Sequence, residues 1–338
     1  MELNIVWFGL VGVLLAGYAV LDGFDLGVGA LHLLTKTDTE RRITLNSIGP
    51  VWDGNEVWLV TAGGALFAAF PDVYATVFSG FYTAFMLLLF VLIFRAVAIE
   101  FRSKQENPRW RSAWDVAFSV SSVVIALLMG VALGNIITGI PLNQSKEFTG
   151  NFLTLLNPYS LLVGITTVAL FMMHGSIYLV LKTEGELQIK IRSWVNNAII
   201  FFVICFVTTT MSTLIYYPSM AAHFKDYPAL FLIAVLNMLA IANIPREIHK
   251  GSEFRAFLSS SSSIVLLMLL FAVGIFPNIV PSDPSPEYSL TIYNAASSQK
   301  TLMIMLIVAL IGMPFVIAYT VIIHKVYKGK VRLDESSY

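Results

Sequence analysis

The chain has 338 residues, of which 57% are hydrophobic and only 12% are charged, and its 21 basic residues balance its 21 acidic ones. A charged share so far below the roughly 25% of soluble domains excludes an ordinary soluble globular protein. Zero net charge without a basic arm argues against nucleic-acid binding, and the lack of a glycine-rich phosphate loop argues against ATP-driven work.

Apolar segments long enough to cross a bilayer, about 20 residues each, recur along the whole chain. The first one follows a start without basic residues and is too long for a signal peptide, so we expect it to be retained. The sequence predicts an all-α, multi-pass membrane protein that forms one transmembrane domain over residues 1–338. The nine predicted spans are 5–33, 51–70, 74–98, 112–138, 158–182, 194–217, 227–245, 256–280 and 302–326.

The basic residues indicate how these spans are oriented, because cytoplasmic loops are rich in Lys and Arg. All of the 21 basic residues except Lys146, Lys225 and Lys300 fall in alternate loops, at the span ends beside those loops or in the C-terminal tail. This pattern predicts an N-terminus outside the cell and a C-terminus in the cytoplasm, which requires an odd number of spans. We expect spans two to five and six to nine to form two four-helix bundles, with the first helix beside them.

Four carboxylates lie in or beside the first two spans. Asp22 and Asp25 are three residues apart and share one helix face, among glycines that let another helix approach closely. Asp53 and Glu56 repeat this spacing at the start of the second span. An ionised carboxylate in hydrocarbon costs several kcal/mol, so such acids indicate a proton path, an ion site or a buried polar contact.

The sequence favours a functional role for some of the four acids more than for others. Asp25 lies deepest, about 12 Å from the cytoplasmic end of its helix at 1.5 Å per residue, and is the favoured proton carrier. Asp22 is better interpreted as a hydrogen-bond partner between helices. Glu56 and Asp53 fit a proton path, but acids near a helix start are also favoured by the helix dipole. Arg95 either pairs with one of these acids or extends to the headgroups.

Two tryptophans, Trp52 and Trp58, flank Asp53. They could pack against a cofactor that a neighbouring subunit holds, and a core or interface role is equally compatible with their size. We assign the solvated edge of the membrane to two further acids, Glu100 and Asp115.

Of the five histidines, only His174 lies well inside a predicted span. We interpret it as a core histidine with satisfied hydrogen bonds rather than as a metal ligand. The others lie near span ends or in loops: His32, His223, His249 and His324. A haem held by two imidazoles needs two histidines at similar depth, and Cys205 is the only cysteine. We therefore predict that this chain by itself holds no haem and no metal.

Several segments match a known family pattern. They are residues 18–29, 40–42, 49–59, 63–71, 101–104, 150–152, 156–158 and 297–299. With these segments the chain resembles subunit II of the cytochrome bd-type quinol oxidases over nearly its whole length.

This resemblance implies a nine-helix subunit in the bacterial cytoplasmic membrane, paired with a subunit I that carries haem b and haem d type cofactors. The complex would oxidise quinol and reduce dioxygen to water, with protons taken from the cytoplasm. This chain would be its non-haem-ligating subunit, and the resemblance leaves open a small accessory single-helix subunit.

Carried over residue by residue, the resemblance implies a proton path through Asp25 and Asp53, and structural or cofactor-adjacent roles for Trp52 and Arg95. Our hypothesis is that Asp53 collects protons at the cytoplasmic side and Asp25 passes them to the subunit interface. Two rivals remain at this point: a proton- or cation-coupled secondary transporter, and a structural partner whose acids only hold helices together.

Overall fold

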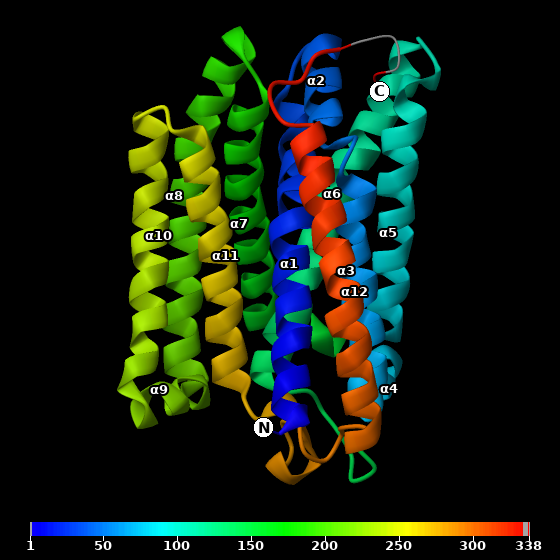
Figure 1. Cartoon of the computed structure of the whole chain (residues 1–338), viewed down its shortest axis with the longest axis vertical. Helices are drawn as coiled ribbons and strands as arrows, with labels where there is room; N and C mark the ends of the chain where they lie inside the picture. The colour runs from blue at the N-terminus through cyan, green and yellow to red at the C-terminus, as the bar shows by residue number, and fades with distance from the viewer. Residues whose placement is uncertain (1, 334–336, 338) are drawn as a thin grey trace.

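A computed structural model describes residues 2–333 and 337 of the chain. Long helices that run roughly alongside one another dominate it (Figure 1). The α-helices are α1 Leu3–Leu31, α2 Asp38–Ile48, α3 Trp52–Ala69, α4 Pro71–Gly80, α5 Tyr82–Phe101, α6 Pro108–Thr138, α7 Pro158–Lys182, α8 Gly185–Tyr216, α9 Ala222–Asp226, α10 Phe231–His249, α11 Glu253–Ile275 and α12 Gln299–Val326. Short 3-10 segments are η1 His32–Leu34, η2 Arg102–Lys104, η3 Phe152–Leu155, η4 Pro218–Ala221, η5 Pro228–Leu230 and η6 Pro286–Tyr288.

The remaining regular structure is a small hairpin at one end of the helices. Strands β1 Asn278–Val280 and β2 Leu290–Thr291 pair antiparallel, with Asn278 opposite Thr291 and Val280 opposite Leu290. This hairpin occupies part of the predicted eighth span, which therefore ended too late: α11 stops at Ile275, two residues before Pro277. Proline lacks the N–H that a continuing helix needs.

Eight helical segments in the described part of the chain are long and apolar enough to cross a membrane. They correspond to eight of the nine predicted spans and confirm an all-α, polytopic membrane protein. The remaining predicted span, the second one at 51–70, is present as α3, but its first two turns carry Asp53, Asn55 and Glu56 and make it less apolar than the others.

The third predicted span began too early. Residues 71–80 form the separate helix α4, which begins at Pro71, and the long helix α5 begins only at Tyr82. Helices α3 and α5 thus run antiparallel, joined by α4 (Figure 1). Helix α8, in contrast, begins at Gly185, well before the predicted residue 194, because its polar first turns continue the apolar helix.

Several helix starts follow ordinary capping rules. The Asn107 and Asn157 side chains accept backbone N–H groups at the starts of α6 and α7, each followed by proline in the first turn. Thr37 and Glu40 form a capping box at α2.

Partial burial acts to raise the pKa of Glu40, but hydrogen bonds from Lys190 and from the backbone N–H groups of Lys36 and Thr37 outweigh it and hold that pKa below its usual value.

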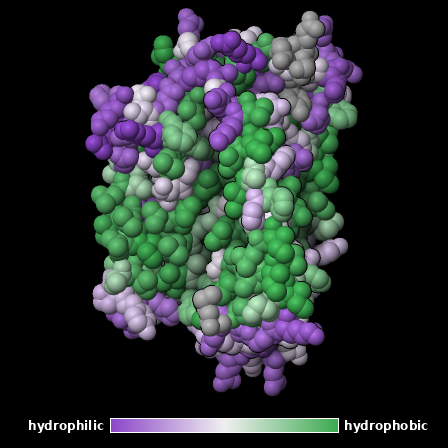
Figure 2. All heavy atoms as spheres, viewed as in Figure 1, coloured by the Kyte–Doolittle hydropathy of each residue, from purple (hydrophilic) through white to green (hydrophobic). Residues whose placement is uncertain are grey.

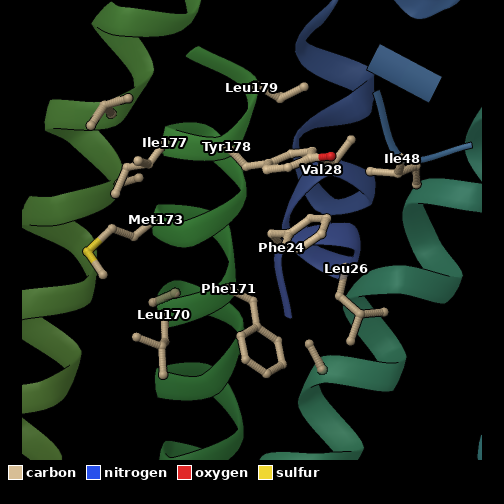
Figure 3. Packing of buried hydrophobic residues seen from close by; sticks show 14 of the residues in the cluster. Phe24, Leu26, Val28, Ile48, Leu170, Phe171, Met173, Ile177, Tyr178 and Leu179 are labelled. Atoms are coloured by element: carbon tan, nitrogen blue, oxygen red, sulfur yellow. The ribbon is translucent and has the colours of Figure 1, made fainter. Parts of the chain in front are cut away.

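Helix α1 is the centre of the molecule and packs against α3, α6, α7, α11 and α12. Figure 3 shows its Phe24, Leu26 and Val28 among buried side chains of α7. The Phe24 ring stacks on Tyr178, with ring centroids 4.0 Å apart.

The expected grouping of spans six to nine into one bundle is wrong. Helix α12 packs against α1 and α3, whereas α7 packs against α8 and α11, and α10 against α11 (Figure 1). The long loop of residues 276–298 carries the chain from α11 to the other side of α1. Local hydropathy carries no information about which neighbour a helix selects.

Glycines explain how closely α1 approaches its neighbours. A Cβ added to Gly27 would lie 1.8 Å from the backbone oxygen of Phe171, and one added to Gly175 would lie 2.5 Å from the carbonyl carbon of Gly27. The prediction that these small residues let another helix approach closely is therefore confirmed, with α7 as the partner.

The surface has a hydrophobic band between two hydrophilic ends (Figure 2). Exposed Leu, Ile, Val and Phe side chains of α8, α10 and α12 supply much of the band. The last turn of α12 and the α10–α11 connection lie at one end, and the start of α1 lies at the other (Figure 1).

Candidate functional site

The first candidate site is the Arg95 cluster, which consists of Tyr18, Asp22 and Asp25 of α1, Asn55 and Glu56 of α3, and Arg95 of α5. Arg95 is fully buried and donates through Nη2 to Asp22 Oδ1 at 2.9 Å. Its Nη1 donates to Glu56 Oε1. Arg95 therefore pairs with two acids and does not extend to the headgroups, and the ion pairs join α1, α3 and α5.

Asp25 differs from its neighbour Asp22, because no basic side chain of the described residues contacts it. The side chain is fully buried, and Asn55 Nδ2 donates to its Oδ2 at 2.8 Å and to the Leu21 carbonyl at 3.2 Å. Burying a carboxylate without a compensating cation is costly. Asp25 is thus the acid of this cluster whose charge has no counter-ion in direct contact.

Several polar atoms of the cluster are buried and have no hydrogen-bond partner among the described residues. They are Tyr18 Oη, Asp22 Oδ2, Asp25 Oδ1 and Arg95 Nε. Buried polar atoms of this kind are usually satisfied by ordered water. The cluster therefore offers free donors and acceptors, on α1 and α5, to which a chain of water molecules can bind.

The structure does not bring Asp53 into this cluster. Asp53 is exposed in the first turn of α3, and Trp52 beside it is partly buried against the main hydrophobic core. Glu56, one turn further, has a partly buried side chain and reaches Arg95. Of the predicted site residues, Asp22, Asp25, Glu56 and Arg95 thus come together, while Asp53 and Trp52 lie at the edge.

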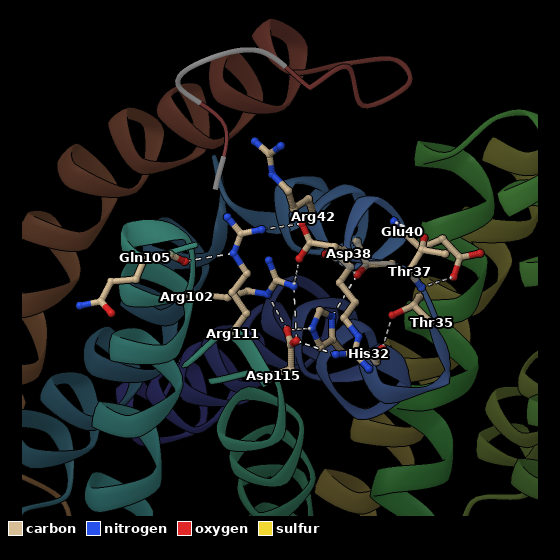
Figure 4. Close-up of polar contacts among 12 residues, drawn as sticks. His32, Thr35, Thr37, Asp38, Glu40, Arg42, Arg102, Gln105, Arg111 and Asp115 are labelled. Carbon is tan, nitrogen blue, oxygen red and sulfur yellow. Dashed lines mark hydrogen bonds and ion pairs between the residues drawn. The ribbon is translucent and has the colours of Figure 1, made fainter. Parts of the chain in front are cut away.

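A second group, the Asp115 cluster, was not predicted (Figure 4). The placement of Asp115 at a solvated membrane edge is wrong, because its side chain is only 1% exposed. Its Oδ1 accepts from Arg102 Nε at 2.5 Å and lies 2.7 Å from His32 Nε2, and its Oδ2 accepts from Arg41 Nη1 at 2.8 Å. The acid is therefore the centre of a buried ionic network.

This network ties together the ends of four segments. Arg102 also donates to Asp38 at 2.8 Å, and Arg111 donates to the other oxygen of Asp38 at 2.8 Å. The network thereby joins the end of α1, helix α2, the end of α5 and the start of α6. The sequence offered one indication of this network, because Arg41 and Arg102 both lie in segments that match the family pattern. The positions of these arginines relative to Asp115 in the sequence did not indicate a contact.

Three of the five histidines, His32, His174 and His324, are engaged in hydrogen bonds. His174 lies 2.7 Å from Ser260 Oγ and 3.0 Å from the Val20 carbonyl, which confirms it as a satisfied core histidine. The other ring nitrogen of His32, Nδ1, lies 3.0 Å from Thr44 Oγ1. In His324, Nδ1 lies 2.9 Å from the Thr320 carbonyl oxygen, and Nε2 has no hydrogen-bond partner among the described residues. Within residues 2–333 and 337, no three His, Cys, Asp or Glu residues are grouped to hold a metal. These residues do not fit a haem held by two imidazoles.

Comparisons with known proteins agree with this arrangement. The family model described as cytochrome bd terminal oxidase subunit II matches residues 3–327. The chain is 39% identical to the cytochrome bd-I ubiquinol oxidase subunit 2 of Escherichia coli (strain K12), over 94% of this chain and 92% of that protein. It is 34% identical to the cytochrome bd ubiquinol oxidase subunit 2 of Bacillus subtilis (strain 168), over 99% and 98%.

A solved structure shows the same fold. A chain of the bd oxidase from Geobacillus thermodenitrificans superimposes with a TM-score of 0.80 at 15% sequence identity, covering 97% of this chain and 99% of that chain. The match to the family model and the two relatives each extend over more than nine-tenths of the sequence. The chain therefore belongs to the family of subunit II of the cytochrome bd terminal oxidases.

Proposed function

We propose that this chain lines a cytoplasmic proton path in a quinol-oxidising terminal oxidase and that it supports the haem-bearing subunit I without ligating haem itself. As a member of its family it is part of an oxidoreductase complex of the respiratory chain, formed with subunit I, and a multi-pass protein of the bacterial inner membrane. Family membership disfavours the secondary transporter.

The haem b and haem d type cofactors belong, in this proposal, to subunit I, and quinol is the substrate of the complex. The relatives named ubiquinol oxidase support the substrate class. The hydrogen-bonded states of His32 and His174 support haem ligation elsewhere. A small accessory single-helix subunit and bilayer lipid are further proposed partners, for which the exposed apolar helices provide surface.

The membrane arrangement proposed is one transmembrane domain over residues 1–338 with nine spans, the N-terminus outside and the C-terminus in the cytoplasm. The second of these spans is α3, which adds one crossing to the eight apolar helices. Two of its polar residues, Asn55 and Glu56, face inward, since Asn55 contacts Asp25 and Glu56 contacts Arg95. Polar side chains that are paired inside the bundle are compatible with a membrane position.

The proton path is the part of the proposal with the clearest chemical reason. Reduction of dioxygen to water consumes protons, and hydrocarbon cannot supply them. Asp25 is the proposed carrier, and the observation that supports it best is its burial without a counter-ion beside unpartnered polar atoms of α1 and α5. Asp53 and Glu56 are the proposed entry groups, because both lie at the start of α3, on either side of Asn55.

The other residues of the site have supporting roles in this proposal. Asp22 and Arg95 hold α1 and α5 at the distance that the path needs, through their 2.9 Å ion pair. Trp52 packs on the core beside the entry. A purely structural role for all of the acids is the second candidate, and the same ion pairs favour it.

Replacing Asp25 with Asn in the purified complex separates these two candidates. The amide keeps the size of the side chain but cannot carry a proton, so quinol-driven oxygen consumption should fall about a hundredfold, the lower end of what a positioned acid–base group contributes. The haem spectrum and the yield of complex should stay unchanged. The exposed Asp72→Asn variant, at the start of α4, is the matched control and should keep full turnover. Normal turnover of Asp25→Asn would remove Asp25 from the path.

A further inference from the structure

A cavity of about 680 Å³ opens at the end of the bundle where α6 and α8 finish and α7 begins. This end is opposite the basic loops, and the Arg95 cluster does not contribute to the cavity. The volume lies within the 300–1,000 Å³ typical of small-ligand pockets. The lining residues used below are Asn157, Tyr159, Ser212, Tyr216, Tyr217 and Asp283, and we refer to it as the tyrosine cavity.

Aromatic rings form one wall of the tyrosine cavity. The ring centroids of Tyr159 and Tyr217 are 4.6 Å apart, with the ring planes inclined at 55°. The hydroxyl of Tyr159 is already paired with Thr213 Oγ1 at 2.7 Å, which holds this ring in position. Tyr216, the last residue of α8, is 72% exposed beside them. Tyr159 itself is only 8% exposed, so the accessible ring surface of this wall comes mainly from Tyr216 and Tyr217.

A single charged side chain, Asp283, lines the cavity within the described part of the chain. Its carboxylate has no hydrogen bond or ion pair among the described residues, while its backbone N–H donates to the Ile140 carbonyl at 3.1 Å. Gly139 makes this close approach of two loops possible: its φ is +79°, and an added Cβ would lie 3.1 Å from Asp283 N. The backbone contacts thus place an unpaired negative charge beside tyrosine rings.

We infer that the tyrosine cavity binds an ammonium group. Tyrosine faces attract cations through the ring quadrupole, and a carboxylate adds a charge-assisted hydrogen bond. No Lys or Arg lines the cavity within the described residues, so it lacks the groups that hold phosphate or carboxylate ligands. Asn157 and Ser212 supply neutral polar contacts for the rest of such a ligand. The ammonium could come from an ethanolamine phospholipid headgroup or from a small soluble amine.

The test measures ligand binding to the purified complex with subunit I, by native mass spectrometry or by thermal shift. The probes are short-chain phosphatidylethanolamine, short-chain phosphatidylglycerol and free ethanolamine. We expect phosphatidylethanolamine or ethanolamine to bind more tightly than phosphatidylglycerol, and Asp283→Asn to weaken that binding about tenfold. Glu287→Gln, a nearby acid of η6 that does not line the cavity, is the matched control and should bind like the unaltered complex.

The outcomes distinguish the two sources and can overturn the inference. Tight binding of phosphatidylethanolamine with weak binding of ethanolamine identifies a lipid headgroup, and equal binding of both identifies a soluble amine. Unchanged binding in Asp283→Asn, or tighter binding of phosphatidylglycerol than of either amine, would refute an ammonium site. A Tyr217→Leu variant adds a check on the rings, since it should weaken binding while the charge of Asp283 remains. None of these results depends on oxygen consumption, so they do not depend on the proposed proton path.

Discussion

At the scale of single residues, Arg95 has the strongest structural influence in the candidate site. It is fully buried and compensates two acids on two other helices, Asp22 and Glu56. Removing one partner of a buried ion pair destabilises a protein far more than replacing both partners with apolar residues, because the remaining charge stays poorly solvated. The role of Arg95 is therefore to make the neighbouring carboxylates tolerable inside the bundle.

We predict that Arg95→Met lowers the stability of the assembled complex by about 3–5 kcal/mol, since it leaves buried acids without a counter-ion. Thermal unfolding of the detergent-purified complex measures the effect. Adding Asp22→Asn to the same chain should recover part of the loss, because it removes one of the uncompensated charges. The control is Arg109→Met, which alters an exposed arginine at the start of α6. An Arg95→Met complex as stable as this control would contradict the assignment.

The sequence predicted the residues of the Arg95 cluster better than their contacts. The spacing of Asp22 and Asp25 on one helix face indicated a buried polar site, and both are buried. The partner of Arg95 stayed open, because helical periodicity says nothing about a residue 73 positions away. Asp115 was missed for the same reason: two of its partners, Arg41 and His32, are 74 and 83 positions distant in sequence.

At the scale of elements, the contact between α1 and α7 depends on glycine. In membranes, where apolar burial does not favour helix–helix contact over lipid, close packing of small residues is a main source of association. Gly27 and Gly175 meet at this contact, and a Cβ on either would overlap the backbone of the other helix. Apolar periodicity could locate both helices but could not identify which pair would meet at these glycines.

We predict that Gly27→Ala destabilises the complex by about 1–3 kcal/mol, because the added methyl group forces α1 and α7 apart. The intrinsic preference of helices for alanine acts in the opposite direction by up to about 1 kcal/mol. Gly12→Ala, on the same helix, isolates that preference, since nothing lies within 4 Å of the position of its added Cβ. Thermal unfolding of the two variant complexes should therefore shift in different directions. If Gly27→Ala matched Gly12→Ala, the close contact would not limit stability.

At the scale of the whole molecule, eight clearly apolar helices and one partly polar helix must be placed in a membrane. Lipid cannot satisfy exposed polar groups, so a spanning helix must pair its polar side chains internally. Helix α3 meets this condition for Asn55 and Glu56, whose partners are on α1 and α5. A hydropathy average misses such a span, because it counts a paired polar residue as if it faced lipid.

Those features of the arrangement that composition determines could be predicted from the sequence. The features that depend on contacts between distant residues could not. The predominance of long apolar helices follows from hydropathy, whereas the position of α12 beside α1 and α3 does not. Its apolar residues satisfy a lipid-facing position on any side of the bundle equally well. The residues of 276–298 that carry the chain across form turns, a short hairpin and a 3-10 segment, without a periodic signal for direction.

The number and direction of the crossings can be measured with single cysteines in a Cys205→Ser chain. If α3 spans the membrane, cysteines at the exposed positions Lys36 and Asp72, before and after it, must react from opposite sides. We expect a membrane-impermeant maleimide added to spheroplasts to label Asp72→Cys at once, and Lys36→Cys only after permeabilisation. Lys300→Cys and Lys328→Cys, at the two ends of α12, should behave as outside and inside respectively. Labelling of both Lys36→Cys and Asp72→Cys from the same side would leave eight crossings and put the two chain termini on one side of the membrane.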